Sequence, residues 1–367
     1  MSPPVIPPWP GRSPWPQHPE RILVVKPCCL GDVLMATPAL RALHLAFPQA
    51  SIDVAVTAWA APVLDGNPRL RRLVRYPDRA TPQAVLRLGL RLRRERYQLG
   101  IGLDRSPVVN LLLWLAGIPV RAGIDSQRRG VLLTHRARPR PGQHETELSL
   151  EVLGQLGIEP QGLHPEYEIS LEAQESVRHT LAGLGIQSGA RALVVIHPGG
   201  AVNPGTTMLS KRWPPERYAE LIDRLVVDHG VAVVLVGGSS DREAVEAVKQ
   251  AARSSVYDLC EQLSLPELAA LCAEAQLFVG NDSGVSHLAA AVGTPTVTIF
   301  GPTSPLQYRP LGPRSRVCAP EASWRLPTGV DLRRGQREDP ALDIRQVTVD
   351  EVYGACAHVL GQAATRC

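Results

Sequence analysis

The sequence has no long apolar run and little net charge of either sign. No stretch reaches the roughly 18 to 20 apolar residues that cross a bilayer; the nearest, residues 108–120, is interrupted by Asn110 and Gly117. Residues 1–19 hold neither a basic nor an apolar signal region, so we expect no signal peptide. The net charge of +4, from 39 Lys and Arg against 35 Asp and Glu, does not indicate a nucleic-acid partner. We expect a soluble protein.

Motifs of metal, hydride-transfer and hydrolytic chemistry are also missing. The seven cysteines form no CxxC pair and no zinc-finger spacing, and their odd number suits a reducing cytoplasm. There is no Asp-x-Asp, HExxH or P-loop motif, which argues against metal-dependent transfer, and there is no GxSxG elbow. The GxGxxG dinucleotide fingerprint is absent as well. We expect a cytoplasmic protein that uses no metal and no cofactor.

The chain does contain a repeated alternation of apolar strands and helical segments. Its 367 residues suit two domains of roughly 150 residues, and its 44% hydrophobic residues can form a core in each. Short apolar runs, each followed by enough residues for a crossover helix, indicate parallel α/β sheets. The predicted strands are residues 22–25, 52–56, 99–103, 192–196, 231–236, 277–280 and 296–300, whereas residues 301–346 look rich in loops.

Composition divides the chain into four parts. Eight of the 34 prolines lie within the first 19 residues, so we expect residues 1–20 to be a disordered extension. We expect a first domain over residues 21–175, a second over 176–340, and a last helix within 341–367 that packs back on the first domain. Ligands of open parallel sheets bind beyond the carboxyl ends of the strands, so the loops after the strands are the candidate sites.

The loop after the first strand, residues 26–33, places Asp32 at the start of a helix. A carboxylate there stabilises the helix through capping and the dipole, by about 0.5 to 2 kcal/mol, so a structural role also explains it. Gly31, just before Asp32, allows another molecule to approach the backbone, although it also suits a plain turn. Both residues are candidates for a site.

The loop after the strand at residues 277–280 is a candidate anion site. Ser283 and Gly284 stand at a helix start, where free N–H groups bind anions such as a diphosphate. His287, one turn later, can reach the same anion or pack against the sheet. Asp282 would repel a phosphate, so it suits a sugar hydroxyl or a helix cap.

Two further loops add glycines and charge. Gly199 and Gly200 follow a buried strand and lead to Lys211, which lies ahead of a helix. Lys211 can neutralise charge on a leaving group, or it is an ordinary surface lysine. The loop at residues 237–243 can hold a nucleotide's ribose through Glu243 or Asp241.

The segment 69–96 is strongly basic, with ten arginines against Asp78 and Glu95. Such a cluster indicates either a solvated helix face or the attraction of an anionic acceptor or an acidic lipid surface.

Together, these loops resemble glycosyltransferase family 9, the heptosyltransferases that add heptose to the inner core of lipopolysaccharide. The resemblance covers about residues 21–310 and rests on four stretches that occur in order. They are RILVVKPCCLGDVLMATPALRALHLAFPQASIDV, VVIHPGG with LSKRWPPERYAELIDRL, VVLVGGSSDRE and FVGNDSGVSHLAAAVGTPTVTIFGPTSP.

The resemblance implies a GT-B fold, with two facing Rossmann-like domains, parallel sheets and an interdomain cleft. It implies a metal-independent, inverting transfer of heptose from ADP-heptose to a lipopolysaccharide-core-like or other anionic glycan. Asp32 would be the general base on the acceptor side, beside Gly31, and Lys211 would stabilise the leaving group. The donor-binding candidates are Gly199, Gly200, Lys211, Glu243, Asp282, Ser283, Gly284 and His287.

Two alternatives stay open: an enzyme of the same fold with a different nucleotide sugar and acceptor, and a non-catalytic nucleotide-sugar-binding protein. Cys28 and Cys29 replace the small polar residues that often precede Leu-Gly-Asp in the family. Thiols form poor hydrogen bonds to a sugar, so this difference from the family leaves the identity of the donor and of the acceptor open. The basic segment 69–96 would give peripheral contact with the inner membrane.

Overall fold

The computed structural model describes residues 18–186, 191–326 and 339–364. Most of the expected disordered extension, residues 1–17, lies outside the described residues. The chain divides into two compact units, Met1–Leu163 and His164–Cys367, each with its own sheet. Among the described residues, no helix is both long and apolar enough to span a bilayer.

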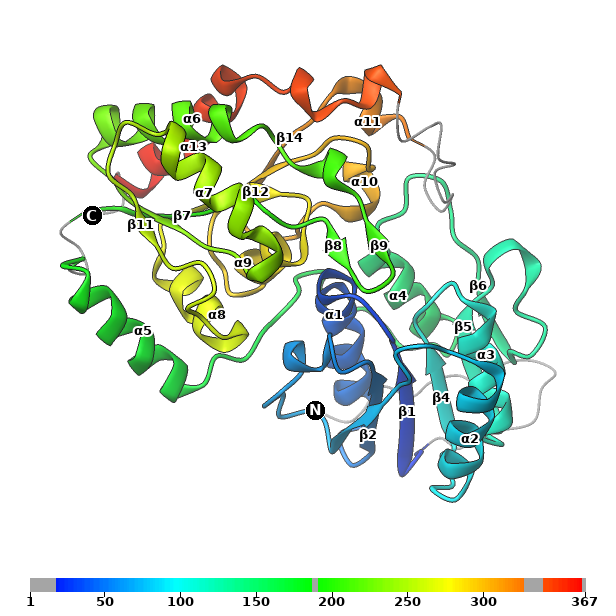
Figure 1. The fold of residues 1–367 in the computed structure, drawn as a ribbon. Helices are drawn as coiled ribbons and strands as arrows, with labels where there is room; N and C mark the ends of the chain where they lie inside the picture. Colours follow the sequence, from blue (N-terminus) through cyan, green and yellow to red (C-terminus); the bar gives the residue numbers. More distant parts are fainter. Residues whose placement is uncertain (1–17, 187–190, 327–338, 365–367) are drawn as a thin grey trace. The chain divides into compact units, whose positions relative to one another are not determined.

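The first unit alternates strands and helices (Figure 1). Its strands are β1 (Arg21–Val25), β2 (Ser51–Val56), β3 (Arg72–Arg75), β4 (Leu99–Gly102), β5 (Val120–Ile124) and β6 (His135–Ala137). Its α-helices are α1 (Leu30–Ala46), α2 (Pro82–Arg93), α3 (Pro107–Leu115) and α4 (Glu145–Gly154), with short 3₁₀ turns η1 (Ala61–Val63) and η2 (Ser126–Arg128).

The six strands of the first unit form one parallel sheet in the order β3-β2-β1-β4-β5-β6. Helices α2 and α3 pack against the face that carries Leu23 and Val25 of β1. Helix α1 connects β1 to β2 in the opposite direction along the sheet from α3, so a right-handed crossover places it on the other face. Helix α4 packs against α1. The central strand β1 therefore leads directly into α1 and the candidate residue Asp32.

The second unit repeats this plan. Its strands are β7 (Leu193–His197), β8 (Val202–Asn203), β9 (Thr206–Thr207), β10 (Ala232–Leu235), β11 (Tyr257–Asp258), β12 (Leu277–Asn281), β13 (Thr296–Ile299) and β14 (Ser315–Cys318). Its α-helices are α5 (Leu171–Gly183), α6 (Pro215–His229), α7 (Arg242–Ala251), α8 (Leu265–Glu274), α9 (Gly284–Ala291), α10 (Pro305–Tyr308), α11 (Glu321–Trp324) and α13 (Val349–Ala364). Four 3₁₀ turns complete it: η3 (Leu209–Lys211), η4 (Ser239–Asp241), η5 (Pro340–Leu342) and η6 (Ile344–Gln346).

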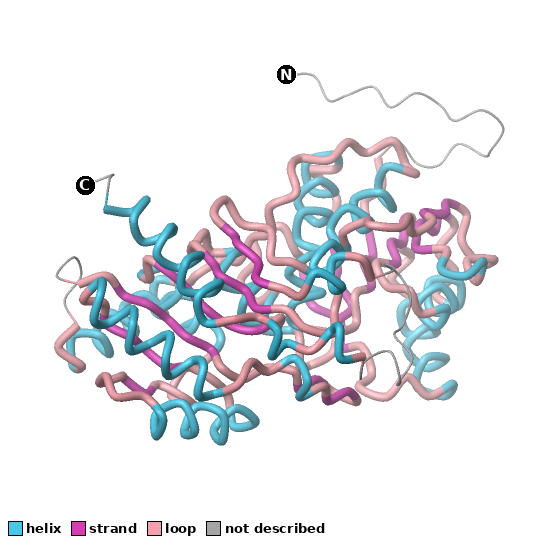
Figure 2. The backbone as a smooth tube through the Cα atoms, turned by 90° about the horizontal axis from the view of Figure 1, so that it is seen from above, coloured by secondary structure: helices cyan, strands magenta, loops and turns pink. Residues whose placement is uncertain are grey.

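The main sheet of the second unit is also parallel, in the order β11-β10-β7-β12-β13-β14. Helices α6, α7 and α13 contribute to the core on one face, and α5, α8 and α9 to the core on the other. The strands lie between these helices (Figure 2). The predicted parallel α/β class is therefore confirmed in both units, and the central strands β7 and β12 carry candidate loops at their ends.

The two compact units divide between Leu163 and His164, ahead of the domain boundary expected at residues 175/176. That expected boundary falls inside α5. The helix packs on the second unit through an apolar stripe that includes Ala173 and Val177. In addition, the Ser176 hydroxyl donates a hydrogen bond to Glu267 of α8.

The last helix differs from the expectation that residues 341–367 pack back on the first domain. Val352, Cys356 and Val359 of α13 are buried in the core that α6 shares with the second sheet. Their spacing of three and four residues forms one apolar stripe along the helix. This stripe is buried in the core of the second unit, to which the helix itself belongs.

The first unit holds one buried ionic cluster, centred on Asp53 of β2. The Asp53 carboxylate is fully buried and accepts hydrogen bonds from Arg71 Nε at 2.8 Å and Arg72 Nε at 3.0 Å. The hydroxyl of Tyr97 donates to the same group. Burial alone would raise the pKa of Asp53, but the hydrogen bonds from Arg71 and Tyr97 and the two guanidinium charges bring it below its ordinary value.

We expect Asp53→Asn to destabilise the first unit by about 3 kcal/mol at neutral pH, because it leaves the arginines without their buried counter-charge. Since the pKa of Asp53 is lowered by folding, this contribution is present above about pH 4 and is lost as the pH falls further. Urea unfolding at pH 7 and at acidic pH measures both effects. The difference in the free energy of unfolding between Asp53→Asn and the wild type should decrease at acidic pH. The control Asp65→Asn, at an exposed aspartate, should unfold like the wild type.

Candidate active site

Asp32 lies in the first turn of α1, just beyond the carboxyl end of β1. Its Oδ2 accepts a hydrogen bond from the backbone N–H of Cys29 at 3.2 Å, and its Oδ1 lies 4.0 Å from Lys26 Nζ. The Asp32 side chain is 34% exposed, whereas Lys26 is buried. The helix-capping role predicted as an alternative therefore exists, and the carboxylate still remains accessible.

The pKa of the Asp32 carboxyl is raised above its ordinary value. Desolvation is the main cause, and the charges of Glu145 and Asp104 add to it, while Lys26 and the Cys29 N–H act in the opposite direction. A carboxylate with a raised pKa accepts a proton more readily than an ordinary aspartate. These surroundings suit a general base.

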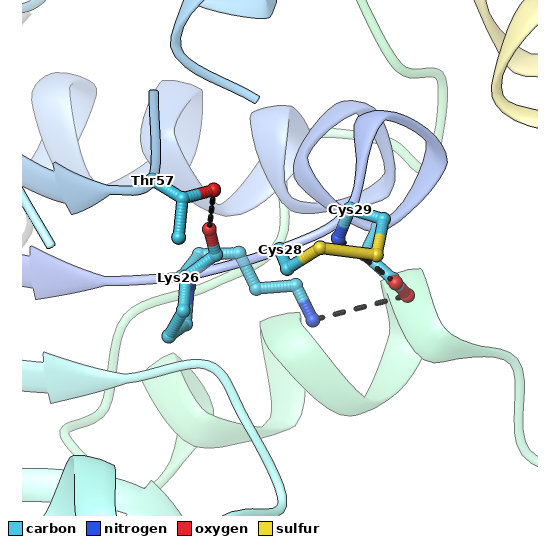
Figure 3. The surroundings of a disulfide bond; sticks show 6 residues. Lys26, Cys28, Cys29 and Thr57 are labelled. Atoms are coloured by element: carbon cyan, nitrogen blue, oxygen red, sulfur yellow. Dashed lines mark hydrogen bonds and ion pairs between the residues drawn. A yellow bond between two sulfur atoms is a disulfide. The ribbon is translucent and has the colours of Figure 1, made fainter. Parts of the chain in front are cut away.

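Cys28 and Cys29, expected to present thiols, are joined by a disulfide bond. Figure 3 shows the bridge near the Lys26 ammonium, with Thr57 on the other side of the loop. Thr57 donates two hydrogen bonds to the carbonyl of Pro27, from its hydroxyl at 2.8 Å and its backbone N–H at 2.9 Å. The expectation of two thiols at this loop is therefore wrong, since both sulfur atoms are used in one disulfide.

In the second unit, three loops meet on the buried carboxylate of Asp241. Its Oδ1 accepts hydrogen bonds from the Gly200 N–H at 2.8 Å and from Arg212 Nη2 at 3.1 Å. Its Oδ2 accepts one from the Gly238 N–H at 3.0 Å and lies 3.2 Å from His197 Nε2. Both oxygens are engaged within the protein, so Asp241 suits a structural role better than ribose binding.

Glycine at two positions permits this close approach. A Cβ atom at residue 199 would lie 2.3 Å from Asp241 Cγ, and one at residue 200 would lie 2.7 Å from Ser283 Cβ. Gly200 also has a φ of +87°, which side chains rarely adopt. Gly199 and Gly200 therefore bring the loop after β7 against its neighbours, and the Gly200 N–H is used by Asp241.

Asn281, at the end of β12, ties the same loop to the start of α6. Its Oδ1 accepts hydrogen bonds from the Trp213 N–H at 3.0 Å and the Tyr218 hydroxyl at 2.9 Å. Its Nδ2 donates to the carbonyl oxygens of Pro198 and Gly199, both at 2.9 Å. The side chain is fully buried, so all four hydrogen bonds are shielded from water.

Lys211 and Asp282, two of the predicted donor-binding residues, form an ion pair. Lys211 Nζ lies 2.5 Å from Asp282 Oδ2, and the Thr303 hydroxyl donates to the same oxygen at 2.7 Å. Asp282 is buried and Lys211 is largely so. A cation and the carboxylate that we predict to contact the sugar therefore lie together at the carboxyl ends of the second sheet.

The remaining donor-binding candidates occupy the starts of two helices. Gly284 begins α9, and the Ser283 hydroxyl does not cap that helix but lies 3.4 Å from His197 Nδ1. His287, in the next turn of α9, is buried, and its reach to an anion stays a prediction. Glu243 is exposed in the first turn of α7.

A cavity of about 810 Å³ lies beside the Lys211 loop. It is lined by the 207–214 loop, by Pro302 next to Thr303, and by residues 339–345. This size is typical of small-molecule sites. Within the described ranges, we find no group of three or more His, Cys, Asp or Glu side chains that could hold a metal ion.

The basic segment 69–96 divides into two parts. Arg71 and Arg72 are bound to Asp53 and Glu95, and Arg75 pairs with the exposed Asp78. These arginines therefore serve the first unit itself. The arginines of α2 lie on the exposed side of that helix.

Sequence reasoning missed four side chains that organise the second unit: His197, Arg212, Asn281 and Thr303. All four lie inside the quoted motifs; His197 and Asn281 directly follow predicted apolar strands, and Arg212 lies beside Lys211. A polar residue directly after a fully apolar strand is the sequence feature that could have identified His197 and Asn281. The sequence could not give their partners, which lie between 12 residues away along the chain, for Arg212 and Gly200, and 86 residues away, for His197 and Ser283.

The donor-side loops lie within a region that matches a known protein family. The model of the family described as "Glycosyltransferase family 9 (heptosyltransferase)" matches residues 85–337. The chain belongs to this family. It is 32% identical to lipopolysaccharide heptosyltransferase 2 of Escherichia coli (strain K12), over 81% of this chain and 87% of that protein. It is 28% identical to lipooligosaccharide heptosyltransferase 2 of Haemophilus influenzae, over 86% and 92% respectively. The chain is therefore a glycosyltransferase.

Solved structures of the family share the fold. The glycosyl transferase family 9 structure from Veillonella parvula aligns with a TM-score of 0.79 at 23% identity, covering 94% of this chain and 98% of that one. The structure of E. coli ADP-heptose lps heptosyltransferase II aligns with a TM-score of 0.72 at 27% identity, covering 94% and 99%. The GT-B fold predicted from the sequence is thereby confirmed.

Replacing Lys26 with Met removes the cation that opposes protonation of Asp32, so the pKa of the Asp32 carboxyl should rise above its wild-type value. A ¹³C NMR titration of labelled aspartate measures this pKa. Lys26→Arg keeps the charge and should leave the pKa close to wild type. An unchanged pKa in Lys26→Met would contradict the electrostatic link.

Proposed function

We propose that this family 9 enzyme transfers heptose from ADP-heptose to a lipopolysaccharide-core acceptor or another anionic glycan in the cytoplasm, with inversion and without a metal ion. Two observations carry the proposal: the first unit holds an accessible, desolvated carboxylate at Asp32, and the second holds Lys211 and the start of α9 among loops that follow its strands. The relatives, which include lipopolysaccharide heptosyltransferase 2 and an ADP-heptose heptosyltransferase, support the donor and the acceptor class.

On the donor side, Ser283 and Gly284 would bind the diphosphate through the start of α9, where backbone N–H groups favour an anion. Lys211 would leave Asp282 and move to the phosphate, since a dianionic diphosphate attracts it more strongly than one carboxylate does. Asp282 and Thr303 would then be available for sugar hydroxyls. Glu243, which is exposed, would accept a hydrogen bond from the ribose.

On the acceptor side, Asp32 would take the proton from the attacking hydroxyl, with Gly31 leaving room for the sugar. The hydroxyl oxygen forms a bond to the anomeric carbon as the bond from that carbon to the β-phosphate oxygen breaks. Inversion follows from attack on the face opposite the leaving ADP. The negative charge that develops on ADP would be stabilised by Lys211 and the start of α9, which is the role a metal ion has in other transferases.

We also propose that helices α2 and α3 give the enzyme peripheral contact with an anionic membrane. They lie side by side (Figure 1) and expose four large apolar side chains, Leu86 at 46%, Leu90 at 52%, Leu111 at 37% and Trp114 at 51%. Neither helix contains an acidic residue, and α2 carries three arginines. Apolar side chains beside arginines complement an anionic bilayer, whereas a second copy would bring like charges together.

Asp32→Asn should lower the rate constant of heptose transfer about 10²- to 10⁴-fold, because the amide cannot accept the acceptor's proton. Binding of ADP should stay within a few-fold of wild type, since Asp32 belongs to the acceptor side. Single-turnover kinetics with ADP-heptose and calorimetry with ADP measure the two effects. Asp65→Asn, an exposed aspartate of the same unit, is the matched control. Near wild-type turnover of Asp32→Asn would exclude Asp32 as the base.

Arg87→Gln/Arg91→Gln should weaken binding to vesicles that contain phosphatidylglycerol about 30-fold, from about 1 kcal/mol for each arginine near the surface. Leu90→Ser/Trp114→Ser should weaken it as well, and none of these changes should alter ADP binding. Co-sedimentation with anionic and with neutral vesicles measures this. Val227→Ser, an exposed apolar residue of the second unit, is the control. Equal vesicle binding by all variants would contradict the proposal that α2 and α3 contact the membrane.

A further inference from the structure

His197 is a buried histidine at the end of β7 that contacts two polar side chains from other loops. It is 2% exposed. Its Nε2 lies 3.2 Å from Asp241 Oδ2, and its Nδ1 lies 3.4 Å from Ser283 Oγ. A chain of three groups therefore leads from a buried carboxylate to the hydroxyl at the start of α9.

The carboxylate end of this chain has a fixed protonation state. Burial alone would raise the pKa of Asp241, but the hydrogen bond and charge of His197 and the N–H groups of Gly200 and Gly238 bring it well below its usual range. Asp241 is therefore ionised, and an ionised carboxylate only accepts hydrogen bonds. His197 Nε2 must then carry a proton, which leaves Nδ1 as the variable position.

The state of Nδ1 decides what Ser283 offers to a ligand. If Nδ1 has no proton, it accepts the Ser283 O–H, and the Ser283 oxygen presents only lone pairs, which repel a phosphate oxygen. If Nδ1 is protonated, it donates to Ser283 Oγ and leaves the hydroxyl hydrogen for the phosphate. The second state also adds a positive charge near the anion.

We propose that His197 is a positioning residue for the donor diphosphate, and that binding of the nucleotide sugar is coupled to uptake of one proton at His197 Nδ1. The proton turns the Ser283 hydroxyl into a donor toward the diphosphate. This inference rests on the proposed function, because it takes Ser283 as a diphosphate contact.

The charged groups around His197 allow this coupling. Asp241, from η4, stabilises the protonated ring, and Arg212, at the end of η3, is bound to the other Asp241 oxygen at 3.1 Å. On the side of α9, Asp282 precedes Ser283 and is paired with Lys211, and His287 is buried one turn into the helix. The charges of these side chains therefore balance one another before a ligand binds. An incoming diphosphate adds negative charge, which favours binding of a proton at His197 Nδ1.

Calorimetry with ADP-heptose, without acceptor, tests the coupling. The diphosphate of a nucleotide sugar has no group that titrates near neutral pH, so any proton exchanged comes from the protein. Titrations in buffers of different ionisation enthalpy give the number of protons taken up. The wild type should take up protons near neutral pH, and its affinity should weaken by up to about tenfold per pH unit as the pH rises. His197→Gln, which can still donate to Asp241 but stays neutral, should show neither effect.

Two variants separate this role from a structural one. Ser283→Ala keeps His197 and Asp241 but removes the hydroxyl between His197 and the diphosphate, so its proton uptake should fall well below that of the wild type, and adding His197→Gln to it should weaken binding less than His197→Gln weakens the wild type. His229→Gln, an exposed histidine of the same unit, should keep the wild-type uptake. Proton uptake that persists in both His197→Gln and Ser283→Ala, or is absent from the wild type, overturns the inference. Failure of the wild type to bind ADP-heptose at all would instead overturn the proposed function.

Discussion

The buried carboxylate of Asp241 is the group on which the loop arrangement of the second unit depends. It gathers the ends of β7 and β10 and the loop after η3 by accepting hydrogen bonds from Gly200, Gly238 and Arg212 and by contacting His197. A buried ionised carboxylate is costly unless every oxygen is satisfied, and here each oxygen has two partners. The same constraint explains why glycine occupies position 199, where a Cβ would collide with Asp241.

Asn281 completes this framework from the neighbouring strand, so that the loop after β7, the start of α6 and the end of β12 form one hydrogen-bonded assembly. In the proposed reaction, this framework would hold the Lys211 loop and the start of α9 in place before charge develops on the leaving group, where they would take the role of a metal ion. Asp32 of the first unit contrasts with Asp241, because its side chain is partly exposed and its pKa is raised, whereas Asp241 is buried and its pKa is lowered. In the proposed reaction, the second unit would stabilise the developing negative charge, and Asp32 of the first unit would accept the proton.

The sequence predicted the central strands well because they are short, continuous apolar runs, as β1, β7 and β12 illustrate. It missed the edge strands β3, β6 and β14, whose sequences RLVR, HRA and SRVC contain arginine and are only partly buried. It also missed the two-residue edge strand β11 and the internal strand β5, whose apolar run VRAGI is interrupted by Arg121. Asp32, Lys211 and Ser283 could be picked out because they stand after apolar strands in a recognisable family motif. The chain of Asp241, His197 and Ser283 could not, since its two contacts join residues 44 and 86 positions apart and only folding brings them together.

The most direct test of the account is calorimetric binding of ADP, UDP and GDP to the purified protein, each with and without a chelator. The account predicts that ADP binds most tightly and that the chelator leaves its affinity unchanged, because the second unit supplies the cationic groups itself. A preference for UDP or GDP would contradict the proposed donor, and loss of ADP binding with the chelator would contradict the metal-free site.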